Sequence, residues 1–242
     1  IGKYAYQLIY FGKIQDGLNL AKLAVKTNKK DEKLWMILSE AQIANKLYED
    51  ALISLKYAAE LNSNISEIYF AKSNIYLKQS KLNKAKAALK TGLKIEPENH
   101  NAIFQLGNIS LMEKNYTKAI KLFDNAVEIK PDFWQSINNK ALAYFEESKK
   151  DMSIKLFRKA ISIEENAEPL LGLASCLRER DINLALKLAK QALNKNPNYV
   201  EFNYRKEQLW GDKIQRSTEI LLKNNELRKE IDIAKSKIKR TS

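Results

Sequence analysis

Small residues recur along this chain at intervals of 34 residues, and this period constrains the fold more than any other feature. One series of small residues consists of Gly17, Ala51, Ala85, Ala119 and Ser153. A second series consists of Ala24, Ala58, Gly92, Ala126 and Ala160. A bulkier series between them consists of Ala21, Leu55, Leu89, Phe123 and Phe157. Because three separate positions share one period, the sequence predicts an array built from a single repeated supersecondary unit.

The spacing predicts a helix, a tight turn and a second helix in each unit. Small residues are expected where two helices cross closely, and the bulkier residue between them fills the gap to the next unit. Glycine and proline number only seven and four, so few positions interrupt a helix. All four prolines (Pro97, Pro131, Pro169 and Pro197) fall near the expected junctions between helices. The fold class predicted is therefore all-α.

The period divides residues 1–199 into six units with the approximate bounds 1–31, 32–65, 66–99, 100–133, 134–167 and 168–199. The first unit lacks its first three residues, and the sixth is two residues short around Arg180–Asp181. From Val200 onward the period fades. We expect residues 200–224 to cap the exposed end of the array and residues 226–240 to form a charged amphipathic helix.

The repeat resembles the tetratricopeptide repeat, and the unit 100–133 carries the resemblance best. Its matching residues are Leu106, Gly107, Ala119, Phe123, Ala126 and Pro131. The resemblance implies a right-handed α-solenoid of about six helical hairpins with a C-terminal capping helix, acting as a non-catalytic scaffold for other proteins. The stretch EQLWGDKIQRSTEILL is similar to the tail of some cyanobacterial and plastid repeat proteins, which implies an assembly factor, as in the biogenesis of photosynthetic complexes.

In this family the first helices line a groove that binds a peptide or a protein surface. The groove positions implied here include Tyr6, Met36, Glu40, Phe70, Asn74, Phe104, Asn108, Gln135, Asn138 and Phe145. Asn74, Asn108 and Asn138 could pair with the backbone of an extended peptide. Met36, Phe70 and Phe104 would supply pockets for its side chains. In the alternative interpretation, the aromatic residues pack against the neighbouring hairpin and the amides are merely solvated.

Some repeats of this family bind the C-terminal carboxylate of chaperones through a set of Lys, Asn and Arg residues. Asn108 and Asn139 fit the two asparagine places, but Phe104 stands at the first lysine place. Pro169 and Leu173 occupy the places in the third unit. We therefore expect a protein or peptide partner other than a chaperone tail.

The net charge of +13 suggests a second function, in which a basic surface binds RNA or an anionic membrane. Only seven of the 42 basic residues are arginine, the residue that makes bidentate contacts with bases and phosphates. Acidic residues are interspersed with the lysines, and the excess of lysine fits the codon bias of an AT-rich genome. These observations argue against nucleic acid as the partner.

Residues for catalysis, a metal or a cofactor are not apparent in the sequence. His100 is the single histidine, and Cys176 is the single cysteine and is expected to be a small packing residue. The acidic pair Glu146–Glu147 is expected to be solvated near a helix end. No Gly-rich phosphate loop occurs. We predict that the chain is not an enzyme and needs no cofactor.

No run of about 18 apolar residues occurs, so the sequence predicts no membrane-spanning segment. The sequence begins at Ile1, and a signal or anchor could precede it. We expect a cytoplasmic protein, with membrane association through a preceding segment left open.

Overall fold

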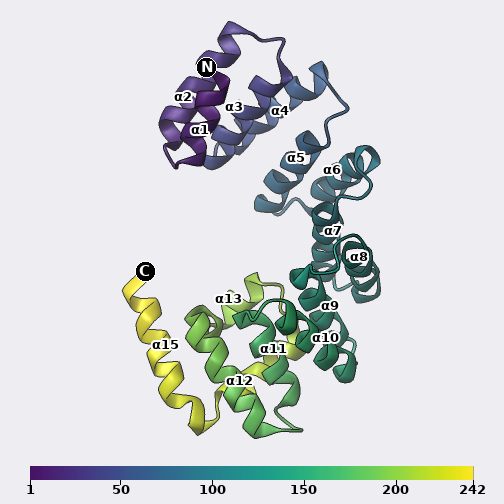
Figure 1. Cartoon of the computed structure of the whole chain (residues 1–242), viewed down its shortest axis with the longest axis vertical. Coiled ribbons are helices and arrows are strands. Elements are labelled where there is room, and N and C mark those ends of the chain that lie inside the picture. The colour runs from purple at the N-terminus through teal and green to yellow at the C-terminus, as the bar shows by residue number, and fades with distance from the viewer. Residues whose placement is uncertain (242) are drawn as a thin grey trace. The chain divides into compact units, whose positions relative to one another are not determined.

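The computed structural model describes residues 1–241, which form α-helices joined by short turns (Figure 1). Within these residues there are fifteen α-helices, two short 3-10 helices and no strand. The predicted all-α fold class is therefore confirmed. No helix in the described part of the chain is long and apolar enough to cross a membrane.

The chain divides into two compact units, and the boundary between them lies inside α7 (His100–Met112), after Ala102. Unit 1 contains three hairpins, which pair α1 with α2, α3 with α4 and α5 with α6. The bounds of these helices are α1 Gly2–Tyr10, α2 Ile14–Thr27, α3 Glu32–Ala44, α4 Tyr48–Leu61, α5 Ser66–Lys78 and α6 Leu82–Ile95. The first helices α1 and α3 also contact each other.

Unit 2 begins at Ile103 and continues the hairpins with the pairs α9–α10 and α11–α12. Its helices after α7 are α8 Tyr116–Ile129, α9 Trp134–Glu146, α10 Lys150–Ile163, α11 Ala167–Leu177 and α12 Ile182–Lys195. The C-terminal segment adds η1 Pro197–Val200, α13 Phe202–Glu207, α14 Asp212–Leu222, η2 Asn225–Leu227 and α15 Arg228–Thr241.

The turn inside each of the first five hairpins contains one residue with positive φ. These residues are Gly12, Lys46, Ser80, Lys114 and Ser148, again 34 apart. In the second hairpin, the Lys46 N–H donates to the Ile43 carbonyl at 2.9 Å, and the Leu47 N–H donates to the Gln42 carbonyl at 2.8 Å. This left-handed turn uses carbonyls that the end of a helix leaves without partners.

The sixth hairpin departs from this pattern as the sequence predicts. Its first helix, α11, has 11 residues, whereas α9 has 13. No described residue in its turn has a positive φ. Instead, the Asp181 side chain accepts a hydrogen bond from the Leu184 N–H at 3.0 Å and so begins α12 directly.

The small residues lie where the helices of a hairpin cross. Ala51, Ala85 and Ala119 are fully buried. A Cβ atom added to Gly17, a member of the first series, would lie 3.2 Å from both the Ala5 carbonyl oxygen and the Ile9 backbone nitrogen of α1. Replacing such a glycine would push the two backbones apart, which is the physical reason for the small residues in the period.

The C-terminal segment packs in two places. Helix α14 contacts the first helices α11 and α9, whereas α15 contacts η1 and the second helix α12. The assignment of the cap to residues 200–224 stays a prediction. Within that range, Trp210, Ile214 and Leu221 belong to the core cluster that α14 shares with α9, α11, α12 and α15.

Candidate binding surface

The first helices of unit 1 form an open hollow, which we call the α3–α5 hollow. Its volume is about 440 Å³. It is lined by Tyr6 of α1, by residues of α3 and α4, and by Glu67 and Ala71 of α5. The lining residues of α3 are Lys33, Met36, Ile37, Ser39, Glu40 and Ile43. Such a size falls within the range of ligand pockets in proteins.

The helical period of α3 directs its side chains to two sides. Leu38 and Ala41 are buried in the core beneath the helix. Met36, Glu40 and Ile43 follow one another at steps of four and three residues, so they share a different stripe of the helix. The sequence therefore places two apolar side chains and one carboxylate together in the hollow.

Glu40 lies in the hollow without a partner. It forms no hydrogen bond or ion pair with any residue that the structure describes. Partial burial raises the pKa of its carboxyl group above the usual value. The second carboxylate of the hollow, Glu67, accepts a hydrogen bond of 3.2 Å from the adjacent Ser66 hydroxyl. A cationic or hydrogen-bonding group that entered the hollow would satisfy these carboxylates.

The other predicted groove residues of unit 1 lie in different surroundings. Tyr6 lines the hollow and remains 46% exposed. Phe70 is partly buried, and its ring covers Gly92 of α6, where an added Cβ atom would collide with it. Asn74 is exposed. Phe70 thus packs against the second helix of its own hairpin, whereas the alternative interpretation expects the aromatic residues to pack against the neighbouring hairpin.

The corresponding first helices of unit 2, α9 and α11, are covered by α14. The Glu146 carboxylate at the end of α9 accepts hydrogen bonds from the backbone N–H groups of Lys213 and Ile214, each at 3.0 Å. A carboxylate at this place satisfies N–H groups that the start of a helix leaves free, and it favours the positive end of the helix dipole. Glu146 is buried, so the expectation that it is solvated is wrong.

Further along α14, hydroxyl groups connect it to α11. The Ser217 hydroxyl donates to the Ser175 carbonyl at 2.7 Å, and the hydroxyls of Thr218 and Ser175 lie 2.7 Å apart. Arg178 donates to Ser217 at 2.8 Å. Because these polar groups pair with one another inside the contact, α14 is bound to α11 by specific hydrogen bonds as well as by apolar packing.

Beneath this cover lies a buried carboxyl group, Glu168 of α11. It accepts a hydrogen bond of 3.1 Å from the Trp210 indole N–H, in the turn between α13 and α14. Burial raises the pKa of Glu168 to about 7, and hydrogen bonds from Trp210, Asn138 and Tyr199 lower it in part. Cys176, one helical turn from Gly172 on α11, is buried, and burial raises the pKa of its thiol to about 12.

The predicted groove residues of unit 2 therefore differ in accessibility. Asn138 is fully buried and donates to Asn139 at 3.0 Å, which in turn donates to Asn108 at 2.8 Å. Phe145 is buried in the cluster that includes α14. Phe104 packs against Phe133 with ring centroids 5.0 Å apart, and Gln135 is exposed. While α14 covers α9 and α11, Asn138 and Phe145 are inaccessible to a ligand.

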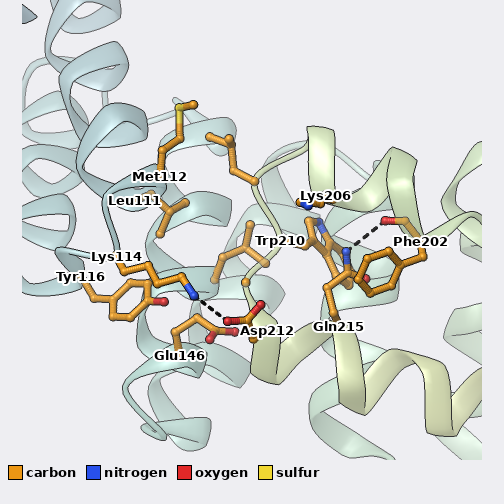
Figure 2. A pocket seen from close by; sticks show the side chains of 13 residues that line it. Leu111, Met112, Lys114, Tyr116, Glu146, Phe202, Lys206, Trp210, Asp212 and Gln215 are labelled. Atoms are coloured by element: carbon orange, nitrogen blue, oxygen red, sulfur yellow. Dashed lines mark hydrogen bonds and ion pairs between the residues drawn. The ribbon is translucent and has the colours of Figure 1, made fainter. Parts of the chain in front are cut away.

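A smaller pocket of about 310 Å³ remains beside α14, where the end of α7 meets the turn between α13 and α14. Figure 2 shows Leu111 and Met112 on one side and Phe202, Lys206 and Trp210 on the other. The Lys114 ammonium and the Asp212 carboxylate form an ion pair of 2.6 Å at this pocket. This pair lowers the pKa of Asp212 and raises that of Lys114.

Sequence reasoning did not find Glu146, Glu168 or Trp210 as members of one contact. Their partners lie 42 to 68 residues away, and no period relates them. A small residue before a helix start, Gly211 before Asp212, is the one local signal. It gives the position of a helix start but not the carboxylate that binds there.

Two family models match the chain, both described as tetratricopeptide repeat, over residues 76–150 and 135–166. The two matches overlap over residues 135–150, which include most of α9, and the second match extends through α10. The chain is a tetratricopeptide repeat protein. The predicted recognition is therefore confirmed, while the resemblance of the tail to cyanobacterial proteins stays a prediction.

Solved structures share the fold of this tetratricopeptide repeat protein at low sequence identity. A structure of MamA is 23% identical, with a TM-score of 0.62, over 68% of this chain and 95% of that one. YrrB, described as a tetratricopeptide repeat protein with an unusual peptide-binding site, is 18% identical, with a TM-score of 0.60, over 77% and 97%. A tetratricopeptide repeat protein from Parabacteroides merdae is 17% identical, with a TM-score of 0.70, over 96% of both chains. No curated protein sequence matches the chain significantly.

Proposed function

We propose that the chain is a non-catalytic scaffold that binds a segment of another protein in the α3–α5 hollow. The observation that carries this proposal is the contrast between the partly apolar, uncovered hollow of unit 1 and the covered first helices of unit 2. Grooves with apolar anchors and a few polar groups are the usual binding sites for protein segments. Of the predicted groove residues, Tyr6, Met36 and Glu40 line the hollow.

The basic surface supports a second candidate, because the net charge of +13 attracts RNA or an anionic membrane. The two functions differ in their response to salt. Binding to phosphate groups falls steeply with ionic strength, whereas binding in a partly apolar hollow changes little. An assembly role such as that of the resembling cyanobacterial proteins would be one use of the same hollow.

A photo-crosslinking amino acid placed at Tyr6 tests the proposal. The matched control carries the same amino acid at Ile53 on the second helix α4, which is 53% exposed and lies outside the hollow. We expect a defined protein to crosslink at position 6 but not at position 53, and to do so equally at about 50 and 300 mM salt.

The opposite result would be capture of nucleic acid or lipid that is lost at high salt and equal at both positions. That outcome would indicate that the basic surface binds the partner, and it would overturn the assignment of binding to the hollow.

A further inference from the structure

We propose that the α3–α5 hollow accepts one amphipathic α-helix of another protein, and that this helix carries a Lys or Arg residue facing Glu40. The inference rests on the proposed function and adds the conformation and charge of the partner. It comes from the helix that the chain itself places on the corresponding first helices of unit 2.

The 34-residue period relates the α3–α5 hollow to the surface beneath α14. A shift of 102 residues, three periods of 34, carries α3 onto α9. By this shift Met36 corresponds to Asn138, Glu40 to Leu142 and Ile43 to Phe145. Residues Leu142 and Phe145 lie in the cluster that packs with α14. The hollow is therefore the position in unit 1 that corresponds to the surface beneath a helix in unit 2.

Helix α14 shows what this surface of the repeat accepts. Its residues Ile214, Thr218 and Leu221, at steps of four and three, are buried on the side of α14 that packs within unit 2. On the other side, Ile220 is 55% exposed. An apolar stripe, the hydroxyls of Ser217 and Thr218 and a helix start bound by Glu146 thus connect α14 to two neighbouring first helices, which is the geometry of a helix bound in a groove.

The difference between the two surfaces predicts the charge of the partner. Where unit 2 has Leu142, unit 1 has Glu40, an exposed carboxylate in the lining of the hollow that forms no hydrogen bond or ion pair with any described residue. Glu67 adds a second carboxylate to the lining, against one ammonium group from Lys33. A helix that covers the hollow would take the Glu40 carboxylate out of water, and a Lys or Arg on that helix would offset this cost by forming an ion pair with it.

The occupant is expected to come from another protein because the C-terminal helices of this chain already have partners. Helix α14 is buried against α9 and α11, and α15 contacts α12 and η1. Releasing α14 to fill the hollow would expose Ile214 and Leu221, which are buried in unit 2.

The test uses a phage-displayed library of random peptides of about 14 residues, four helical turns, selected on the whole chain. Peptides that also bind the Met36→Asp variant are removed first. The selected peptides are then synthesised and titrated against the wild type, Glu40→Gln and the control Ile53→Asp, which carries its change outside the hollow. Circular dichroism establishes that each variant is folded and that each bound peptide becomes helical.

We expect the selected sequences to repeat apolar residues at helical spacing and to contain a Lys or Arg. Glu40→Gln should weaken binding about five- to tenfold, and Ile53→Asp should leave it unchanged. Replacing the basic residue of the peptide by Gln should weaken binding by a similar factor to the wild type and have little further effect on Glu40→Gln.

Three results would overturn the inference. Peptides with alternating or proline-containing patterns that still require Met36 would retain the hollow as a binding site but exclude a helix. Helical peptides whose affinity ignores Glu40→Gln would exclude the charge contact. Selection of no peptide that depends on Met36 would overturn the proposed function together with this inference.

Discussion

The first helices of unit 1 and unit 2 share one repeat pattern, but their surroundings in the folded chain differ. In unit 1, α3 and α5 line an open hollow with an unpaired carboxylate. In unit 2, α9 and α11 are covered by α14, and Asn138 and Phe145 are buried. The comparison teaches that register within a repeat does not by itself make a residue part of a binding surface. A helix that follows the repeats in the same chain can cover the surface that a ligand would otherwise bind.

The contact of α14 with unit 2 can be broken by truncating one buried side chain. We expect Ile214→Ala to lower the free energy of unfolding by about 2–4 kcal/mol, because it leaves a cavity in the core. The matched substitution Ile220→Ala on the exposed side of the same helix should change it by less than about 0.5 kcal/mol. Urea denaturation followed by circular dichroism measures both. Equal effects would mean that α14 does not pack on α9 and α11 as the structure has it.

The buried carboxyl group of Glu168, beneath α14, should make the stability of the folded protein depend on pH. Its pKa in the folded protein is about 7, above the unfolded value of about 4.3, so folding disfavours its charged form. The contribution of Glu168 to the free energy of unfolding is therefore fully present below a pH of about 4.3 and is lost as the pH rises through about 7. Between pH 5 and 8, the free energy of unfolding of the wild type should fall by an amount on the order of 2 kcal/mol. We expect Glu168→Gln to abolish this fall. The groups that face this carboxyl include Asn138, Tyr199 and Trp210.

Thermal unfolding of the wild type and Glu168→Gln across this pH range provides the measurement. Glu40→Gln in the open hollow is the control, since burial raises the pKa of Glu40 as well but the group remains partly exposed. If both substitutions flatten the pH profile equally, the cover by α14 is not what sets the behaviour of Glu168.

Removing the carboxylate that begins α14 should have a smaller effect. Glu146→Ala takes away the acceptor for the N–H groups of Lys213 and Ile214, and we expect a loss of about 1–2 kcal/mol. The position of unit 1 that corresponds to Glu146 is Ala44, which is exposed. Ala44→Glu should leave the stability unchanged, because Ala44 is exposed and α14, the helix whose start Glu146 binds, packs on α9 and α11 of unit 2. Chemical denaturation of the two variants compares the units directly, and a loss from Ala44→Glu would contradict the difference between them.

The smallest expected effect concerns the turns that both units share. Ser80 and Ser148 have φ values of 57° and 64°, which glycine adopts without steric cost. Ser80→Gly should stabilise the protein by about 0.5–1 kcal/mol. Ser148→Gly should gain less, because the Ser148 hydroxyl accepts a hydrogen bond of 2.7 Å from the Lys213 ammonium of α14. The melting temperatures of the two variants show which substitution stabilises the protein more. A larger gain from Ser148→Gly would argue against the contact between Ser148 and Lys213.

Much of the fold could be predicted because the helical period and the turns are local. The small series Ala51, Ala85 and Ala119 marked the buried crossings. The shortage of two residues in the sixth unit appeared as the shorter α11. The candidate site was less predictable: Met36 and Tyr6 line a hollow, but Phe70 packs on Gly92. An aromatic residue at a groove position can turn to either side of its helix, and one sequence does not distinguish them.

The sequence by itself determined the helices, their pairing into hairpins and the tetratricopeptide repeat family. Each of these depends on contacts between neighbours that the 34-residue period repeats. Only the tertiary structure decided that α14 covers α9 and α11 while α3 and α5 stay open. Glu146 binds the start of a helix 67 residues further along the chain, and this contact occurs once. A contact that is distant in sequence and unrepeated leaves no period in the sequence, so it becomes visible only in the folded chain.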